Sequence, residues 1–130
     1  VAICCYDLEK MALYYAGANR PLYFVKEGVL EEIKADKFPI GGRDYDVPKR
    51  FNTQTFSLQK NDAVYISTDG FADQFNADDR KLMTKNFKNL LVSIQDKSMP
   101  EQKAFLDNYI ENWRGTTEQT DDILVIGVKV

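Results

Sequence analysis

The chain has 130 residues, with 17 basic and 20 acidic side chains and a formal net charge of −3. This near-balance does not predict a nucleic-acid partner, and the spread of the charges argues against an acidic tail. No stretch approaches the roughly 20 apolar residues that span a bilayer, and no signal-peptide pattern is present. The length and the ordinary apolar content fit one domain or part of one, with no membrane contact by this segment.

The chain starts at Val1 without Met and continues at once into apolar residues. That start is typical of a chain cut close to a strand. We therefore expect a fragment of a longer protein, in which upstream segments could provide a membrane anchor.

Cys4 and Cys5 are the two cysteines of the chain, which has no histidine. On a strand they would point to opposite faces. Adjacent cysteines without further partners do not form a disulfide framework, and a metal or nucleophile role would need helpers such as histidine. We interpret them as buried structural thiols, which fits a reducing, cytoplasmic setting.

Strand patterns fill the first two-thirds of the chain and are separated by turn residues. The predicted strands are residues 1–7, 11–16, 22–25, 29–34, 51–58 and 63–67. Turns are predicted at residues 7–10, 27–28 and 60–62. Residues 36–50, which contain two prolines and two glycines, are predicted to form an irregular loop.

The pattern then changes to a helical period, with apolar residues at positions 87, 90, 91 and 94. Ser98 and Glu101 fit a capping box that starts a second helix, and Gly115 is a plausible stop. Residues 123–128 are fully apolar and are predicted to form a central strand. Strands, two helices and a strand predict an α+β fold, with helices packed on a mainly antiparallel sheet.

Two aspartates lie where an apolar strand meets a loop. Asp69 follows the predicted strand 63–67, and Asp121 precedes the last strand. If these strands are antiparallel neighbours, both carboxylates lie at one edge of the sheet, where hard oxygen ligands suit Mg²⁺ or Mn²⁺. Gly70 permits a tight turn and a close backbone approach. Spacing alone still favours ordinary turn residues, because Asp and Gly dominate turns.

The motifs around these aspartates carry a more specific signal. Residues 68–75 read TDGFADQF, and residues 119–127 read QTDDILVIG. Upstream, residues 15–22 read YAGANRPL and residues 39–42 read PIGG. In this order, across nearly the whole chain, the four motifs resemble the SpoIIE-type serine phosphatases, a branch of the PPM family of metal-dependent Ser/Thr protein phosphatases.

The resemblance implies a mainly antiparallel β-sandwich flanked by helices, here incomplete at the N-terminus, with a two-metal centre at one end. It implies that Asp69 and Asp121 are ligands of Mn²⁺ or Mg²⁺, and that a metal-activated water attacks phosphorus. We interpret Asp122 as holding the loop of its neighbour. Asp73 receives no firm role. Arg20 could face the phosphate, and a surface or hairpin-packing role is an equal alternative.

Two departures from the family pattern are relevant. The family's first metal motif lies upstream in complete members, and nothing in this chain matches it. A two-metal site cannot close without those ligands, so we expect this fragment alone to be inactive. Eukaryotic-type relatives carry an aspartate that can hold a third metal where this chain has Ala18, so a third metal is not predicted there.

The resemblance implies that the full-length protein removes phosphate from serine or threonine of a partner protein in bacterial signalling. In relatives, that partner is often an anti-sigma-factor antagonist and a sensory domain lies upstream. The alternative is a degenerate phosphatase domain that serves as a regulatory phosphoprotein-binding module. An aspartate with a glycine-rich acidic motif upstream of Val1 would favour the enzyme. We also expect the fragment to self-associate through the sheet edge or face that the missing segment would cover.

Overall fold

The computed structural model describes residues 1–41 and 50–130. Its strands are β1 (Ala2–Asp7), β2 (Ala12–Gly17), β3 (Leu22–Lys26), β4 (Val29–Ile33), β5 (Gln54–Ser57), β6 (Ala63–Ser67) and β7 (Val125–Lys129). Its helices are α1 (Gly70–Asp73), α2 (Thr84–Ser93) and α3 (Met99–Arg114). None of these helices is both long and apolar enough to cross a membrane.

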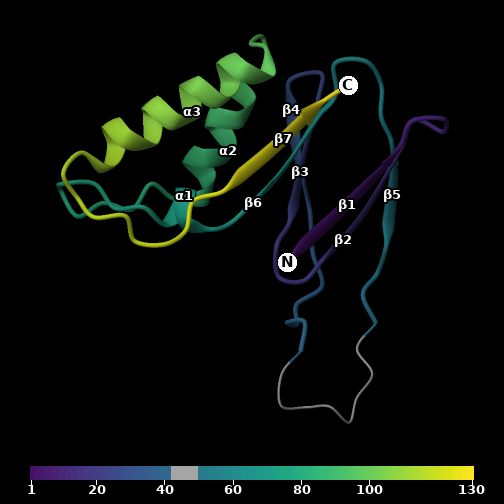
Figure 1. Ribbon diagram of the computed structural model, residues 1–130, viewed down its shortest axis with the longest axis horizontal. Helices are drawn as coiled ribbons and strands as arrows, with labels where there is room; N and C mark the ends of the chain where they lie inside the picture. The colour runs from purple at the N-terminus through teal and green to yellow at the C-terminus, as the bar shows by residue number, and fades with distance from the viewer. Residues whose placement is uncertain (42–49) are drawn as a thin grey trace.

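The strands form two antiparallel sheets. One has the order β1-β2-β5, and the other has the order β4-β3-β6-β7. Helices α2 and α3 lie over one face of the four-stranded sheet, and the three-stranded sheet lies on its other side (Figure 1). The predicted α+β class, a mainly antiparallel sandwich with flanking helices, is therefore confirmed.

The central strands β3 and β6 supply both cores by alternation. Tyr23 and Val25 of β3 are buried in the core beneath the helices, whereas Leu22 is buried between the two sheets. The same alternation places Tyr65 of β6 under the helices and Val64 between the sheets. Because successive strand side chains point to opposite faces, one apolar strand can seal two layers.

The capping box at the start of α3 is confirmed. The backbone N–H of Ser98 donates to Oε2 of Glu101 at 2.8 Å, and the Ser98 hydroxyl donates to the same oxygen at 2.6 Å. Satisfying the first turn in this way stabilises a helix by about 1 kcal/mol. The cap fixes where α3 begins, and so which of its residues face the sheet.

Several predicted boundaries need correction. The strand expected over residues 51–58 is shorter, because β5 covers only Gln54–Ser57. The single-turn helix α1 was not predicted, since four residues carry no periodicity. Of the expected loop 36–50, residues 42–49 lie outside the described residues, and these include the last glycine of the PIGG motif.

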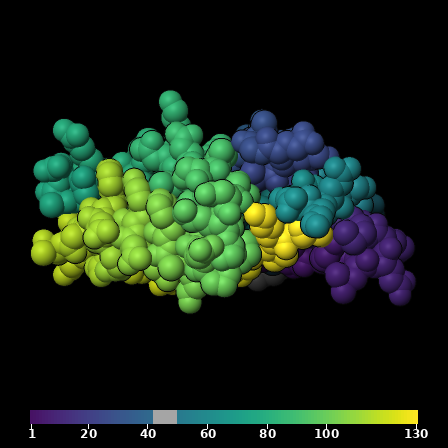
Figure 2. Space-filling model, turned by 90° about the horizontal axis from the view of Figure 1, so that it is seen from above, coloured from purple at the N-terminus to yellow at the C-terminus, as the bar shows by residue number. Residues whose placement is uncertain are grey.

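The prediction that the last strand is central is wrong for the part of the chain described. Among those residues β7 pairs only with β6 and forms an edge of the four-stranded sheet. The side chains of Ile126 and Val128 are each 47% exposed. Figure 2 shows this strand at the surface, between the helical layer and the N-terminal strands. An apolar run indicates burial on two faces but does not reveal how many strands flank it.

The prediction of buried cysteines is also wrong, since Cys4 and Cys5 are both exposed free thiols. They lie on β1, which within residues 1–41 and 50–130 pairs only with β2. Cys4 stands opposite Tyr15 and Cys5 opposite Tyr14. Their apolar sequence neighbourhood predicted burial, but no described element covers the outer side of this strand.

The open edges of the two sheets border an apolar hollow of about 140 Å³. Cys4 and Tyr6 of β1 line it from one sheet, and Ile126 and Val128 of β7 line it from the other. Unpaired strand edges that carry exposed apolar side chains are templates for association with another chain.

We therefore expect the 130-residue chain by itself to self-associate as its concentration rises. Replacing Ile126 by Lys should weaken this association, because a charge on an edge strand opposes pairing. Leu8→Lys is a matched control, since Leu8 is exposed in the turn after β1. Sedimentation velocity over a concentration series measures the effect. A wild-type chain that stays monomeric at high concentration would contradict the expectation.

Candidate metal centre

The two aspartate motifs meet at one end of the four-stranded sheet. Strands β6 and β7 are antiparallel neighbours, with Ser67 opposite Val125, so the loop after β6 lies beside the loop before β7. Thr68 joins these loops: its hydroxyl donates to the backbone oxygen of Asp122 at 2.7 Å, and its backbone N–H donates to that of Leu124 at 3.0 Å. The two strands are therefore antiparallel neighbours, as the prediction of a shared sheet end for Asp69 and Asp121 required.

Gly70 lets the two backbones touch. A Cβ atom at this position would overlap the backbone oxygen of Asp122 and would lie 2.8 Å from its carbonyl carbon and 3.2 Å from the oxygen of Asp121. Any side chain would push the two loops apart. The glycine is therefore required by close packing of one motif on the other, which is a stronger requirement than a turn.

Asp69 pairs with Arg20, which lies in the connection between β2 and β3. Nη2 of Arg20 donates to Oδ2 of Asp69 at 2.8 Å, with the two side chains 36% and 41% exposed. This hydrogen bond is the main cause that lowers the pKa of Asp69. The pairing therefore stabilises the fold above the usual aspartate pKa, and the stabilisation is lost as the pH falls through the lowered value.

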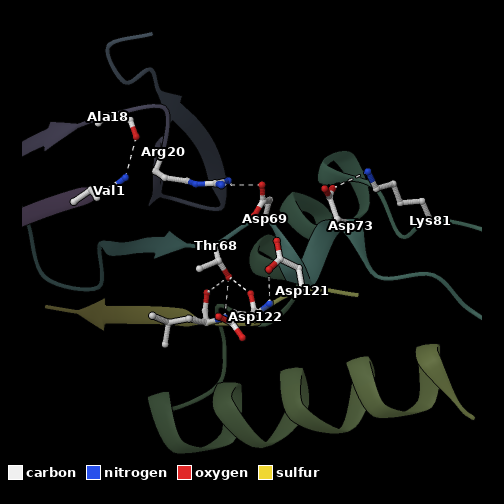
Figure 3. A network of polar contacts seen from close by, with 10 residues as sticks. Val1, Ala18, Arg20, Thr68, Asp69, Asp73, Lys81, Asp121 and Asp122 are labelled. Atoms are coloured by element: carbon white, nitrogen blue, oxygen red, sulfur yellow. Dashed lines mark hydrogen bonds and ion pairs between the residues drawn. The ribbon is translucent and has the colours of Figure 1, made fainter. Parts of the chain in front are cut away.

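Asp121 is fixed by its own loop. Its Oδ1 accepts the backbone N–H of Asp122 at 2.7 Å, and its backbone oxygen accepts Nε2 of Gln119 at 2.9 Å. Among the described residues, the hydrogen bonds of Asp122 are made by its backbone, which holds this loop against Thr68. In Figure 3 the Asp69 and Asp121 side chains project from the same junction.

Asp73 has a structural partner. Its carboxylate lies 3.0 Å from Nζ of Lys81, and both side chains are partly exposed. Figure 3 shows this pair beside the junction, on the side away from Arg20. This ion pair joins the loop after α1 to that helix.

The described residues fit one side of a divalent-metal centre. Asp69 and Asp121 offer hard carboxylate oxygens on rigid backbone at one sheet end, which is the donor chemistry of Mg²⁺ and Mn²⁺. Over residues 1–41 and 50–130, no group of three or more His, Cys, Asp or Glu side chains could hold a metal ion. These residues alone therefore do not complete a metal cage.

Gln74 and Trp113 anchor the second loop, and sequence reasoning predicted this anchoring for neither residue. Gln74 is fully buried, and its Nε2 donates to the backbone oxygen of Glu118 at 2.9 Å. Its Oε1 accepts the N–H of Thr120 at 3.2 Å, while its backbone oxygen accepts the Trp113 indole N–H at 3.0 Å. The signal that could have indicated the burial of Gln74 is its place in the TDGFADQF motif, directly after the apolar residues of α1.

Comparison with known proteins agrees with this geometry. The family model described as "Stage II sporulation protein E (SpoIIE)" matches residues 1–130, the whole chain. The chain belongs to the SpoIIE family. No curated protein was found to match it. The family resemblance inferred from the four motifs is thereby confirmed.

Solved structures of phosphatase domains share the fold of this SpoIIE-family chain. The "SiaA-PP2C domain of Pseudomonas aeruginosa" is 25% identical, with a TM-score of 0.87 over 99% of this chain and 50% of that one. The manganese-presoaked SpoIIE phosphatase domain from Bacillus subtilis is 14% identical, with a TM-score of 0.70 over 100% and 56%. A structure of the RsbU and RsbW domains of Rv1364c from Mycobacterium tuberculosis is 18% identical, with a TM-score of 0.71 over 98% and 35%.

The chain therefore spans about half the length, or less, of these phosphatase chains. It carries the PP2C-type phosphatase fold, and its family is one of metal-dependent phosphatases. One further fold neighbour, RsbX, was solved in complex with magnesium.

Proposed function

We propose that these 130 residues form the C-terminal part of a SpoIIE-type phosphatase domain, in a protein that hydrolyses phosphoserine or phosphothreonine on a partner protein. Asp69 and Asp121 serve as ligands of two Mn²⁺ or Mg²⁺ ions. The observation that supports this assignment best is the junction at Gly70, where the two aspartate loops touch backbone to backbone. A pair of unrelated turn residues would not need that contact.

When bound, two divalent ions would activate a water for direct attack on phosphorus and neutralise phosphate charge. The chain's own contribution is to hold two carboxylates rigidly at the sheet end. Thr68 and Gly70 hold the two loops together, so the backbones that carry both carboxylates are in place before any ion binds. Such preorganisation avoids the cost of ordering the site on binding.

We propose that the remaining metal ligands come from the segment that precedes Val1 in the full-length protein. The proposal is supported by the share of the matched phosphatase chains that these residues span, and by the presence of only part of a ligand set in the described residues. The protein substrate, by resemblance to SpoIIE-type phosphatases, is an anti-sigma-factor antagonist in a cytoplasmic bacterial signalling pathway, under control of an upstream sensory domain.

Phosphate release from a phosphoserine peptide tests this function. The full-length protein should release phosphate with Mn²⁺ and stop when EDTA is added, because the ions supply the attacking water. The 130-residue chain alone should release little or none. Peptide binding without release by the full-length protein would instead identify a phosphoprotein-binding module. Robust Mn²⁺-dependent turnover by residues 1–130 alone would overturn the proposed division of the site.

A further inference from the structure

The backbone at Arg20 is fixed by a buried tyrosine. Tyr15, on β2, is 1% exposed, and its hydroxyl donates to the backbone oxygen of Arg20 at 2.5 Å. Burial is the main cause that raises the pKa of Tyr15 to about 12, so the phenol keeps its proton at neutral pH. The connection between β2 and β3 is thereby fixed at Arg20, the residue whose side chain contacts Asp69 in the candidate metal centre.

The same connection is packed too tightly to move freely. A Cβ atom on Gly17 would lie 2.6 Å from the backbone oxygen of Arg20 and 2.8 Å from Cβ of Ala35, and it would overlap the Tyr15 hydroxyl. Beside it, the Asn19 N–H donates to the backbone oxygen of Asp36 at 2.8 Å. Asn19 adopts a left-handed φ of 58°, which turns the chain toward Arg20. The Arg20 side chain therefore extends from a backbone segment that is held by hydrogen bonds and close packing.

The guanidinium uses one of its five N–H donors on one oxygen of Asp69. Nη2 of Arg20 contacts Oδ2 at 2.8 Å, and no other hydrogen bond of this side chain occurs among the described residues. A carboxylate whose second oxygen is held by a fixed donor presents its first oxygen in a defined direction. Outer partners of this kind commonly orient metal ligands and keep them ionised.

On the basis of the proposed function, we propose that Arg20 is the positioning residue of Asp69, and that the contacts Tyr15–Arg20–Asp69 hold one carboxylate oxygen so that the other is available to the metal. This goes beyond hairpin packing, because the tyrosine, the tight glycine and the turned asparagine all fix the position from which Arg20 reaches the aspartate. The same contacts join the three-stranded sheet, through Tyr15, to the end of the four-stranded sheet at which Asp69 lies.

Mn²⁺ affinity of the full-length protein, measured by isothermal titration calorimetry, tests the proposal without relying on turnover. Arg20→Gln should weaken Mn²⁺ binding about 10- to 100-fold, the usual effect of losing such an outer partner. Arg20→Lys should recover part of the loss, because it keeps the charge but not the planar fork. Lys88→Gln is the matched control: it removes a similarly exposed cation that pairs with Glu32 on β4, and it should leave the affinity nearly unchanged.

Arg20→Gln protein that is folded and binds Mn²⁺ as tightly as wild type, or more tightly, would overturn the proposal. In that case, weaker binding of inorganic phosphate by the variant would make Arg20 a phosphate-binding group instead. If Arg20→Gln does not fold, Tyr15→Phe replaces it, with Tyr14→Phe as the control on the same strand. If only Tyr15→Phe weakens Mn²⁺ binding, the proposal is supported. If Tyr15→Phe and Tyr14→Phe bind Mn²⁺ with the same affinity, the proposal is overturned. Failure of the proposed function itself looks different, because Asp69→Asn would then bind Mn²⁺ like wild type.

Discussion

Replacing Asp121 by Asn in the full-length protein is expected to lower kcat/KM for a phosphoserine peptide about 10³-fold. The substitution keeps the shape of the side chain and removes its charge. A metal ion contributes several kcal/mol of transition-state stabilisation, and about 4 kcal/mol corresponds to that factor. Asp69→Asn should have a comparable effect. Steady-state phosphate release at saturating Mn²⁺ is the measurement.

Asp96→Asn is the matched control for these variants. Asp96 is an exposed carboxylate between α2 and α3, and the backbone oxygen of its neighbour Gln95 accepts Nζ of Lys129 at the opposite end of β7 from the junction, so its loss should leave kcat/KM unchanged. Circular dichroism should show the same fold for all three variants, because the Asp69 and Asp121 side chains are exposed or partly exposed and make few contacts. Near-normal turnover in both Asp69→Asn and Asp121→Asn would refute their assignment as metal ligands.

Gly70→Ala is expected to destabilise the domain by about 2–3 kcal/mol and to weaken Mn²⁺ binding in the same protein. The added methyl group overlaps the Asp122 carbonyl, and backbone atoms cannot swing aside as a flexible side chain would. The two aspartate loops must then separate. Chemical denaturation measures the first effect, and titration calorimetry with Mn²⁺ measures the second.

Gly28→Ala distinguishes this steric effect from an ordinary glycine effect. Gly28 lies at the tip of the β3–β4 hairpin with φ +77° and open space around it. Its substitution should cost about 1 kcal/mol through backbone strain and leave Mn²⁺ affinity intact. A Gly70→Ala protein with unchanged stability and unchanged affinity would mean that the two loops do not touch as described.

Local patterns in the sequence predicted much of the fold. The apolar, β-rich runs at residues 22–25 and 63–67 identified the two strands that seal both cores, since a strand that is apolar on both faces can be buried on both. The capping box at Ser98 located the start of α3, because its hydrogen bonds are formed within four residues. Such features are local, so the sequence alone contains them.

Features that depend on the neighbourhood of a strand were not predictable. The apolar run at residues 123–128 indicated a central strand, yet β7 is an edge in the described structure, since hydropathy does not specify strand order. Cys4 and Cys5 carried the same ambiguity and proved to be exposed. In both cases the side chains resemble core residues, and the described residues provide nothing to cover them.

The candidate site divides in the same way. The motifs placed Asp69 and Asp121 at strand ends, and the antiparallel pairing of β6 and β7 brought those ends together. The contacts that define the site join residues far apart in the chain, such as Arg20 with Asp69 and Gly70 with Asp122. Their geometry depends on how the sheets pack, so no local pattern could have indicated it.

A crystal structure of the complete phosphatase domain grown with Mn²⁺ tests the central claim most directly. Anomalous difference maps should show manganese about 2.1 Å from a carboxylate oxygen of Asp69 and of Asp121. Further ligands should come from the segment before Val1, and Arg20 should still hold the second oxygen of Asp69. Manganese bound elsewhere, with both aspartates uncoordinated, would contradict the account.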